Sequence, residues 1–110
     1  IADCSGHGPS AALIGAMFKM QLFNLVPSME LKDRVVHLRK NMEIVLPDDY
    51  AITFCYAILD SNLTLSYING GHPAPIIHMD GETRFLKGMS PMIMGINMTT
   101  SDEVQTVSLK

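Results

Sequence analysis

The chain has 110 residues, which is enough for one hydrophobic core and too few for two domains. Apolar residues make up 47% of it and charged residues 17%, a composition that excludes a disordered chain. The formal net charge is −3 and Arg39-Lys40 is the longest basic run, so we expect no nucleic-acid partner.

Two features of the composition indicate a compartment. The most apolar stretch, residues 11–26, is interrupted by Lys19 and is shorter than the roughly 20 residues that a bilayer span needs. We therefore expect a buried helix there and no membrane insertion by this chain. Two cysteines, Cys4 and Cys55, do not make a disulfide framework, which favours a reducing, cytoplasmic location. Because the chain opens on Ile1 without a Met, we expect residues 1–110 to be the central part of a longer domain.

Two helices are expected in the first half of the chain, after a strand that ends at Asp3. The first runs from Pro9-Ser10 to about Val26, with Ser10 as its N-cap, and is apolar almost all round. It should therefore be buried on most faces, and four large side chains should pack against a sheet: Leu13, Phe18, Leu22 and Leu25. After Pro27-Ser28, apolar residues recur every three or four positions to about Pro47, which predicts an amphipathic surface helix.

Strands dominate the second half of the chain. Residues 51–59 alternate with a period of two and are apolar on both faces, which predicts a central strand. Asp60-Ser61-Asn62 and Asp80-Gly81 predict hairpin turns, the second of type I′. Further strands are expected at residues 63–68, 76–79, 83–86 and 103–109. One strand, two helices and a run of antiparallel strands predict an α+β layered domain and exclude a doubly wound parallel sheet.

The sharpest chemical feature is the segment Asp3-Cys4-Ser5-Gly6-His7-Gly8 between the first strand and the first helix. A carboxylate at a strand end, before a tight glycine turn, is held rigidly, and Mg²⁺ or Mn²⁺ prefers such preorganised oxygen ligands. The alternative is that Asp3 merely caps backbone N–H groups, and residue types alone favour that alternative. The segment does not contain the G-x-S-x-G sequence of hydrolases, so Ser5 is not indicated as a nucleophile.

This segment, with Pro9-Ser10-Ala11-Ala12, resembles the Asp-Val-Ser-Gly-His-Gly-x-x-Ala-Ala signature of one protein family. That family is the stage II sporulation protein E branch of the type 2C metal-dependent serine/threonine protein phosphatases. Residues 69–75 are similar to its Ala-Gly-His-Pro-Pro element, residues 51–59 stand in place of its Thr-containing strand, and residues 90–96 resemble its Pro-Leu-Gly block. The resemblance implies a layered sandwich of two antiparallel sheets flanked by helices, of which this chain is a truncated central segment.

The resemblance also implies a site for two Mn²⁺ or Mg²⁺ ions. Asp3 would be the catalytic residue that bridges both ions, and the backbone carbonyl of Cys4 would bind one of them. Two turns would flank the chemistry, one that shapes the site (Gly6, His7 and Gly8) and one that is structural (Gly71, His72 and Pro73). The family's Gly-Asp and Thr-Asp-Gly blocks, which supply further metal carboxylates, have no match here. Asn69 and Gly70 also replace the apolar or alanine residues that are more usual before the Gly-His pair.

The implied function is metal-dependent removal of phosphate from phosphoserine or phosphothreonine on a regulatory protein, such as an anti-anti-sigma-type regulator in sigma-factor control. The alternative is an inactive or partial phosphatase-like module that binds a partner protein, and the incomplete ligand set favours it. With one carboxylate and one carbonyl, the 110-residue segment alone is expected to bind metal weakly and to show no turnover. Unpaired strand edges predict association between copies of the chain.

Several other residues have two interpretations each. His7 either hydrogen-bonds a phosphate or a water or is an exposed loop residue, and Asp48-Asp49 either adds a metal ligand or is simply solvated. His37 and His78 are expected at a helix-surface position and a strand position, both without partners. Four clustered methionines either pack in the core and loops or form a patch for a partner: Met89, Met92, Met94 and Met98.

Overall fold

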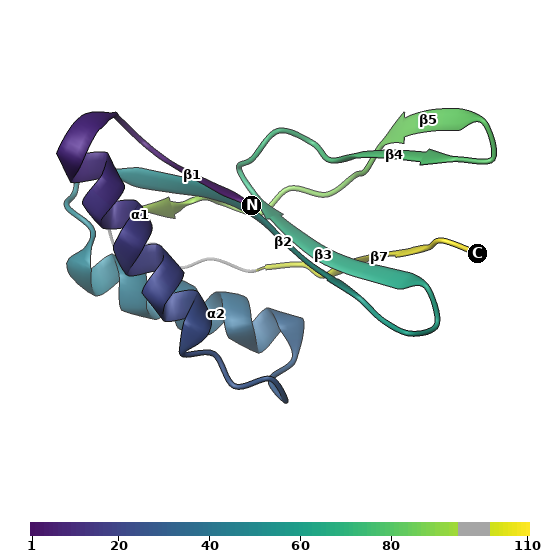
Figure 1. Cartoon of the computed structure of the whole chain (residues 1–110), viewed down its shortest axis with the longest axis horizontal. Helices are drawn as coiled ribbons and strands as arrows, with labels where there is room; N and C mark the ends of the chain where they lie inside the picture. Colours follow the sequence, from purple (N-terminus) through teal and green to yellow (C-terminus); the bar gives the residue numbers. More distant parts are fainter. Residues whose placement is uncertain (95–101) are drawn as a thin grey trace.

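A computed structural model of the chain describes residues 1–94 and 102–110. Its main element is a five-stranded antiparallel sheet of order β1-β2-β3-β7, in which β6 pairs with the first residues of β2. The strands of this sheet are β1 (Ala2–Cys4), β2 (Ala51–Leu59), β3 (Thr64–Gly70), β6 (Ile93–Met94) and β7 (Gln105–Ser108). A two-stranded hairpin of β4 (Ile76–Met79) and β5 (Glu82–Phe85) projects away from the helices (Figure 1). The predicted α+β class with antiparallel sheets is confirmed.

Both helices lie on the same face of the five-stranded sheet (Figure 1). They are α1 (Gly8–Phe23), which packs on β1, and α2 (Leu31–Val45), which packs on β2, β3 and β6. Under them lie the fully buried side chains of Ile52, Phe54 and Ile68, which define the helix-covered face of the sheet. Residues of β2 between these positions point the other way, because successive side chains of a strand alternate. Asp3, Thr53 and Cys55 therefore share the opposite, helix-free face.

The amphipathic helix predicted after Pro27 is confirmed as α2. It buries the apolar side chains that recur at helical spacing: Leu31, Val35, Leu38 and Met42. Among the described residues, neither helix is long and apolar enough to cross a membrane.

The burial predicted for α1 is wrong in part. Its buried side chains are Ile14 and Phe18, one turn apart, whereas Leu13 is 64% exposed and Leu22 is 37% exposed. A helix that packs on a sheet buries the side chains along one of its faces, and an apolar side chain on another face remains exposed to solvent. The predicted N-cap is also wrong: His7 occupies that position, and Ser10 lies inside the helix. Pro9 falls in the first turn, where its missing N–H leaves no hydrogen bond unmade.

The strand predictions hold more closely. β2 lies between β1 and β3, as expected of a strand that is apolar on both faces. Asp80 and Gly81 both have positive φ, 52° and 79°, as a type I′ hairpin turn requires. The two residues of β6 form a strand that the sequence pattern did not indicate, because a run this short carries no readable alternation.

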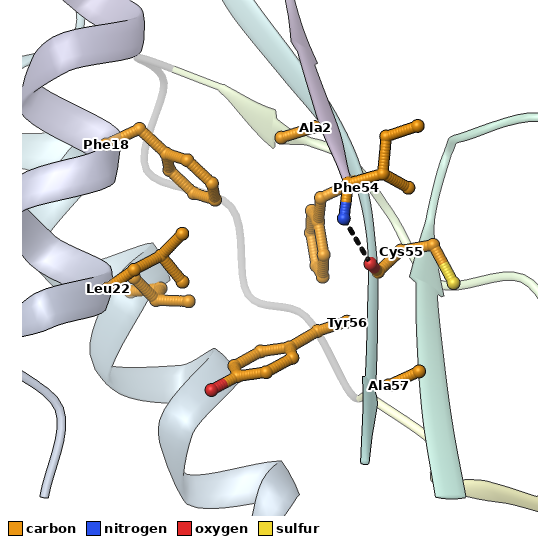
Figure 2. A pocket seen from close by; sticks show the side chains of 9 residues that line it. Ala2, Phe18, Leu22, Phe54, Cys55, Tyr56 and Ala57 are labelled. Carbon is orange, nitrogen blue, oxygen red and sulfur yellow. Dashed lines mark hydrogen bonds between the residues drawn. The ribbon is translucent and has the colours of Figure 1, made fainter. Parts of the chain in front are cut away.

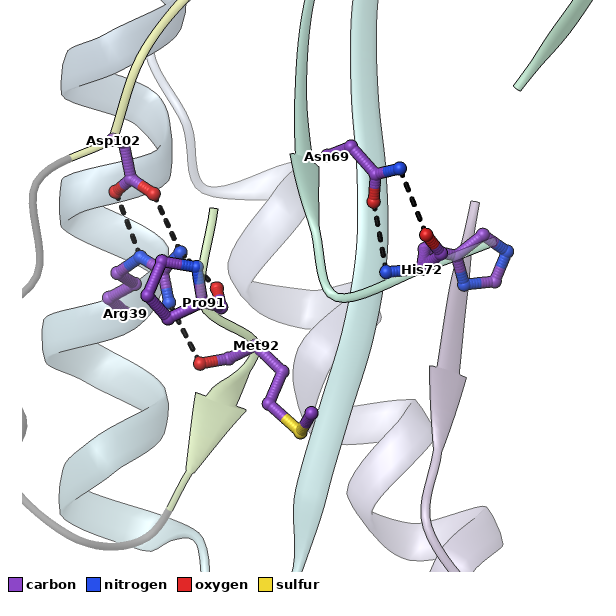
Figure 3. Close-up of polar contacts among 6 residues, drawn as sticks. All are labelled: Arg39, Asn69, His72, Pro91, Met92 and Asp102. Carbon is purple, nitrogen blue, oxygen red and sulfur yellow. Dashed lines mark hydrogen bonds and ion pairs between the residues drawn. The ribbon is translucent and has the colours of Figure 1, made fainter. Parts of the chain in front are cut away.

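A buried charge pair joins α2 to the chain segments around it (Figure 3). Arg39, 4% exposed, donates from Nε and Nη2 to the two carboxylate oxygens of Asp102, at 2.9 and 2.6 Å. The same guanidinium donates to the carbonyls of Met92 at 3.0 Å and Pro91 at 2.5 Å, and it lies 5.3 Å from the centroid of the Phe54 ring. Each of these groups has a hydrogen-bond or charge partner, so the buried charge of Arg39 is compensated.

Candidate functional site

Asp3 lies at the end of β1, on the edge of the sheet. It pairs with Thr53 of β2, so its side chain is on the helix-free face, and the residue is exposed. Two residues earlier on this ladder, Ile1 and Cys55 exchange both main-chain hydrogen bonds, at 2.9 and 3.0 Å. Because hydrogen-bonded pairs alternate along antiparallel strands, Asp3 and Thr53 also occupy a hydrogen-bonded pair position. Asp3 is consequently fixed by backbone pairing while its carboxylate remains in solvent.

The side chain and the main-chain carbonyl of Cys4 point in different directions. Its sulfur faces α1, where a Cβ built on Gly15 would lie 3.9 Å from it, and burial followed by the Asp3 carboxylate raises the pKa of the thiol. Because Cys4 falls between hydrogen-bonded pairs, its carbonyl points away from β2. β1 is the outermost strand of the sheet, so this carbonyl lies at a free edge. The geometry fits the role that the resemblance implies for that oxygen.

The turn after Cys4 is built by glycines and by Ser5. Gly6 and Gly8 have φ of +84° and +78°, a region that other residues rarely enter, which agrees with their predicted place in the turn. The Ser5 hydroxyl accepts from the N–H of Ala51 at 2.8 Å, and the N–H of Ser5 donates to the carbonyl of Ala51 at 2.8 Å. His7 is the exposed N-cap residue of α1, and its side chain makes no capping hydrogen bond.

The second turn brings His72 to the strand that carries the partner of Asp3. Nδ1 of His72 lies 3.0 Å from the hydroxyl oxygen of Thr53. The side chain of Asn69 holds the main chain of His72 on both sides, accepting from its N–H and donating to its carbonyl, each at 2.9 Å (Figure 3). A Cβ at Gly70 would stand 2.1 Å from the Phe54 ring, so alanine does not fit there. The two departures from the family pattern therefore each have a structural reason.

Thr53 and Asn69 were not identified from the sequence as residues that hold His72 in place. Alternation along β2 puts Thr53 on the face opposite Ile52 and Phe54, and this signal was available. Nothing in the sequence pairs Thr53 with Asp3, because strand register is set by contacts between segments that are far apart in the chain.

Within residues 1–94 and 102–110, no three His, Cys, Asp or Glu side chains form a group that could hold a metal ion. Asp48 and Asp49 are exposed in the loop before β2. The prediction that His37 and His78 lack partners is wrong: His37 lies 3.0 Å from the Asn41 amide and His78 2.7 Å from the Thr83 hydroxyl. Asp3 and the Cys4 carbonyl thus fit one side of a metal site, and the described residues do not complete it.

The methionines are spread over different environments. Met89 is 67% exposed, whereas Met92, just before β6, and Met94, within β6, are half-buried. Met98 lies outside the described residues.

A cavity opens on the face of the sheet opposite to Asp3. It measures about 520 Å³ and opens between α1 and β2, where Phe18 and Leu22 face Phe54 and Tyr56 (Figure 2). Its lining is mainly apolar and contains no acidic, basic or histidine side chain, so it is poorly suited to a metal or a phosphate. The cavity does explain the exposure of Leu22, because the end of α1 stands away from the sheet there.

Comparison with models of known protein families gives a match that covers both turns. The family model for stage II sporulation protein E (SpoIIE) matches residues 1–110, which include both turns and the strand between them. No curated protein matches the chain significantly. The resemblance drawn from the four sequence blocks is thereby confirmed.

Proposed function

Because the chain belongs to the stage II sporulation protein E family, we propose that it carries one side of the active site of a metal-dependent protein phosphatase. Family membership implies a phosphatase-related role in sporulation signalling. The proposed substrate is phosphoserine or phosphothreonine on a regulatory protein. One observation supports this most: the Asp3 carboxylate and the Cys4 carbonyl lie at the same free edge of the sheet.

The chain's own residues have separable tasks in this proposal. Asp3 contributes the negative charge that holds divalent cations, and the Cys4 carbonyl adds a neutral oxygen ligand. Two bound Mn²⁺ or Mg²⁺ ions would supply charge stabilisation at the phosphoryl oxygens and an activated water. The glycines of the turn keep side chains away from the edge, and α1 begins at Gly8, so the positive end of its dipole follows the same turn in the chain.

The experiment is a Mn²⁺ titration by calorimetry with a parallel p-nitrophenyl phosphate assay. We expect the full-length protein to bind Mn²⁺ and to hydrolyse the ester only with the metal. Residues 1–110 alone should bind Mn²⁺ weakly and show no turnover, because a lone carboxylate holds such ions poorly. A full-length protein without metal-dependent turnover would contradict the proposal. Micromolar binding by residues 1–110 would reveal ligands beyond Asp3 and Cys4.

A second candidate function is a partner-binding module without catalysis. The observation in its favour is that the described residues contain no group of three potential metal-binding side chains. It predicts that the full-length protein binds its phosphoprotein partner equally well with and without Mn²⁺ and never releases phosphate. Release of inorganic phosphate from that partner, dependent on Mn²⁺, would exclude it.

A further inference from the structure

Among residues 1–94 and 102–110, two histidines each lie close to a threonine, and the two pairs differ in location. In each, Nδ1 of the imidazole lies within hydrogen-bond distance of a threonine hydroxyl: 3.0 Å for His72 and Thr53, and 2.7 Å for His78 and Thr83. His78 and Thr83 face each other across the projecting hairpin. Thr53 instead pairs across the sheet with Asp3. The first pair is therefore at the proposed phosphatase site, and the second is a natural control.

The position of His72 is fixed by more than its own side chain. Asn69, 2% exposed, makes two hydrogen bonds to the His72 main chain, and Nδ1 is occupied by Thr53. The turn also packs closely, since a Cβ at Gly71 would lie 3.1 Å from the Cβ of Met92. A group held this firmly loses little conformational freedom when it binds a ligand, which is the physical advantage of preorganisation.

Thr53 engages Nδ1 of His72, which leaves Nε2 for a ligand, and Thr53 is also the strand partner of Asp3. Side chains paired directly across antiparallel strands have Cβ atoms about 5 Å apart, so Thr53 and Asp3 are near neighbours on the helix-free face. When the Thr53 hydroxyl donates to Nδ1, the proton of the neutral ring is on Nε2, which is then a donor. A phosphoryl oxygen is a strong acceptor for such a donor.

We propose that His72 is a phosphate-binding residue of this site, with Thr53 and Asn69 as positioning residues that set its tautomer and place. This inference rests on the proposed function of the Asp3 edge. It assigns to the second turn a direct contact with the phosphoryl group in addition to its structural role.

The test uses inorganic phosphate as the probe and NMR of the full-length protein with ¹⁵N-labelled histidine, in Mg²⁺ at one fixed pH. We expect His72 to carry its proton on Nε2 and to shift on addition of phosphate, while His78 does not respond. Thr53→Val should remove the preference for this tautomer. Signals are assigned by their loss in His72→Asn and His78→Asn.

Two replacements of His72 separate ligand binding from folding. Asn places a polar group near the position of Nδ1 and has nothing at Nε2, whereas Gln can reach the position of Nε2. His72→Asn should therefore raise the phosphate dissociation constant about tenfold or more, the effect of one hydrogen bond to a charged group. His72→Gln should retain most of the affinity. Mg²⁺ binding should be unchanged in both, and His78→Asn should match the wild type.

Each contrary result overturns either the inference about His72 or the proposed function. Unchanged phosphate affinity in His72→Asn, or equal loss of phosphate and Mg²⁺ binding, would show that His72 is structural and would overturn the inference. Absence of metal-dependent turnover in the wild type would instead overturn the proposed function. In that case a phosphate-induced shift at His72 still supports the binding site, and the lack of any shift removes it.

Discussion

The polar groups on the two faces of the five-stranded sheet differ in how deeply they are buried and in whether they are paired. On the helix-covered face, Arg39 and Asp102 are buried, paired with each other and satisfied by main-chain carbonyls. On the helix-free face, Asp3 is exposed at an edge and pairs with Thr53 of β2, whose hydroxyl contacts His72 of the second turn. A satisfied buried network holds elements together, whereas an exposed carboxylate on a rigid strand is available to a ligand. Changes on the first face should affect stability, and changes on the second should affect activity.

The largest effect is expected for Asp3→Asn in the full-length protein. The amide keeps the shape of the side chain and removes the charge that would hold the cations, so turnover of p-nitrophenyl phosphate should fall by about a hundredfold or more, or roughly 3 kcal/mol in activation free energy. The midpoint of urea unfolding should stay the same, because the residue is exposed. Retention of more than about a tenth of the turnover, a loss under about 1.4 kcal/mol, would remove Asp3 from the site.

Arg39→Met should have the opposite profile. It leaves the Asp102 carboxylate buried without a partner, and breaking such a pair costs about 3–5 kcal/mol in the free energy of unfolding. Urea unfolding measures this loss, with Lys40→Met on the exposed side of α2 as the matched control, where a change within about 0.5 kcal/mol is expected. Equal effects of the two substitutions would show that the pair is not buried.

Two positions of α1 test how much of the helix-covered face is packed. Phe18→Ala removes a side chain that is 7% exposed and should reduce the free energy of unfolding by about 3–5 kcal/mol. Leu22 is 37% exposed and borders the apolar cavity, so Leu22→Ala should cost about 1 kcal/mol, less than the roughly 2–5 kcal/mol of a fully buried leucine. The same unfolding assay decides, and a larger loss for Leu22 than for Phe18 would reverse the packing described for α1.

The smallest effect concerns Cys55, a half-buried thiol on the helix-free face. Burial raises its pKa, and the amino group of Ile1 opposes this in part. Since the thiolate is the reactive form, alkylation at mildly alkaline pH should be slower in the folded protein than in urea. A pKa that is higher in the folded state means that this contribution to stability is present below the ordinary thiol pKa and is lost as the pH rises through the folded value. Equal alkylation rates would show that Cys55 is fully solvated.

The amphipathic helix and the alternating strands were predictable because their patterns state which side is buried. α2 has a polar side and an apolar side, so its apolar residues are the ones that contact the sheet. β2 is apolar on both faces and is central. The turn at Asp80-Gly81 is equally local, since two residues with positive φ suffice to define it. For these elements, neighbours in the sequence carry the whole signal.

The sequence by itself determined the class of the fold, the extent of most strands, and the family signature around Asp3. Tertiary structure decided the orientation of α1, because a helix with no polar side carries no information about which stripe rests on the sheet. It also decided that Arg39 meets Asp102, 63 residues away, and that Thr53 stands between Asp3 and His72. Such contacts depend on strand register and on how the helices pack on the sheet. Both are set by long-range packing that no short stretch of sequence encodes.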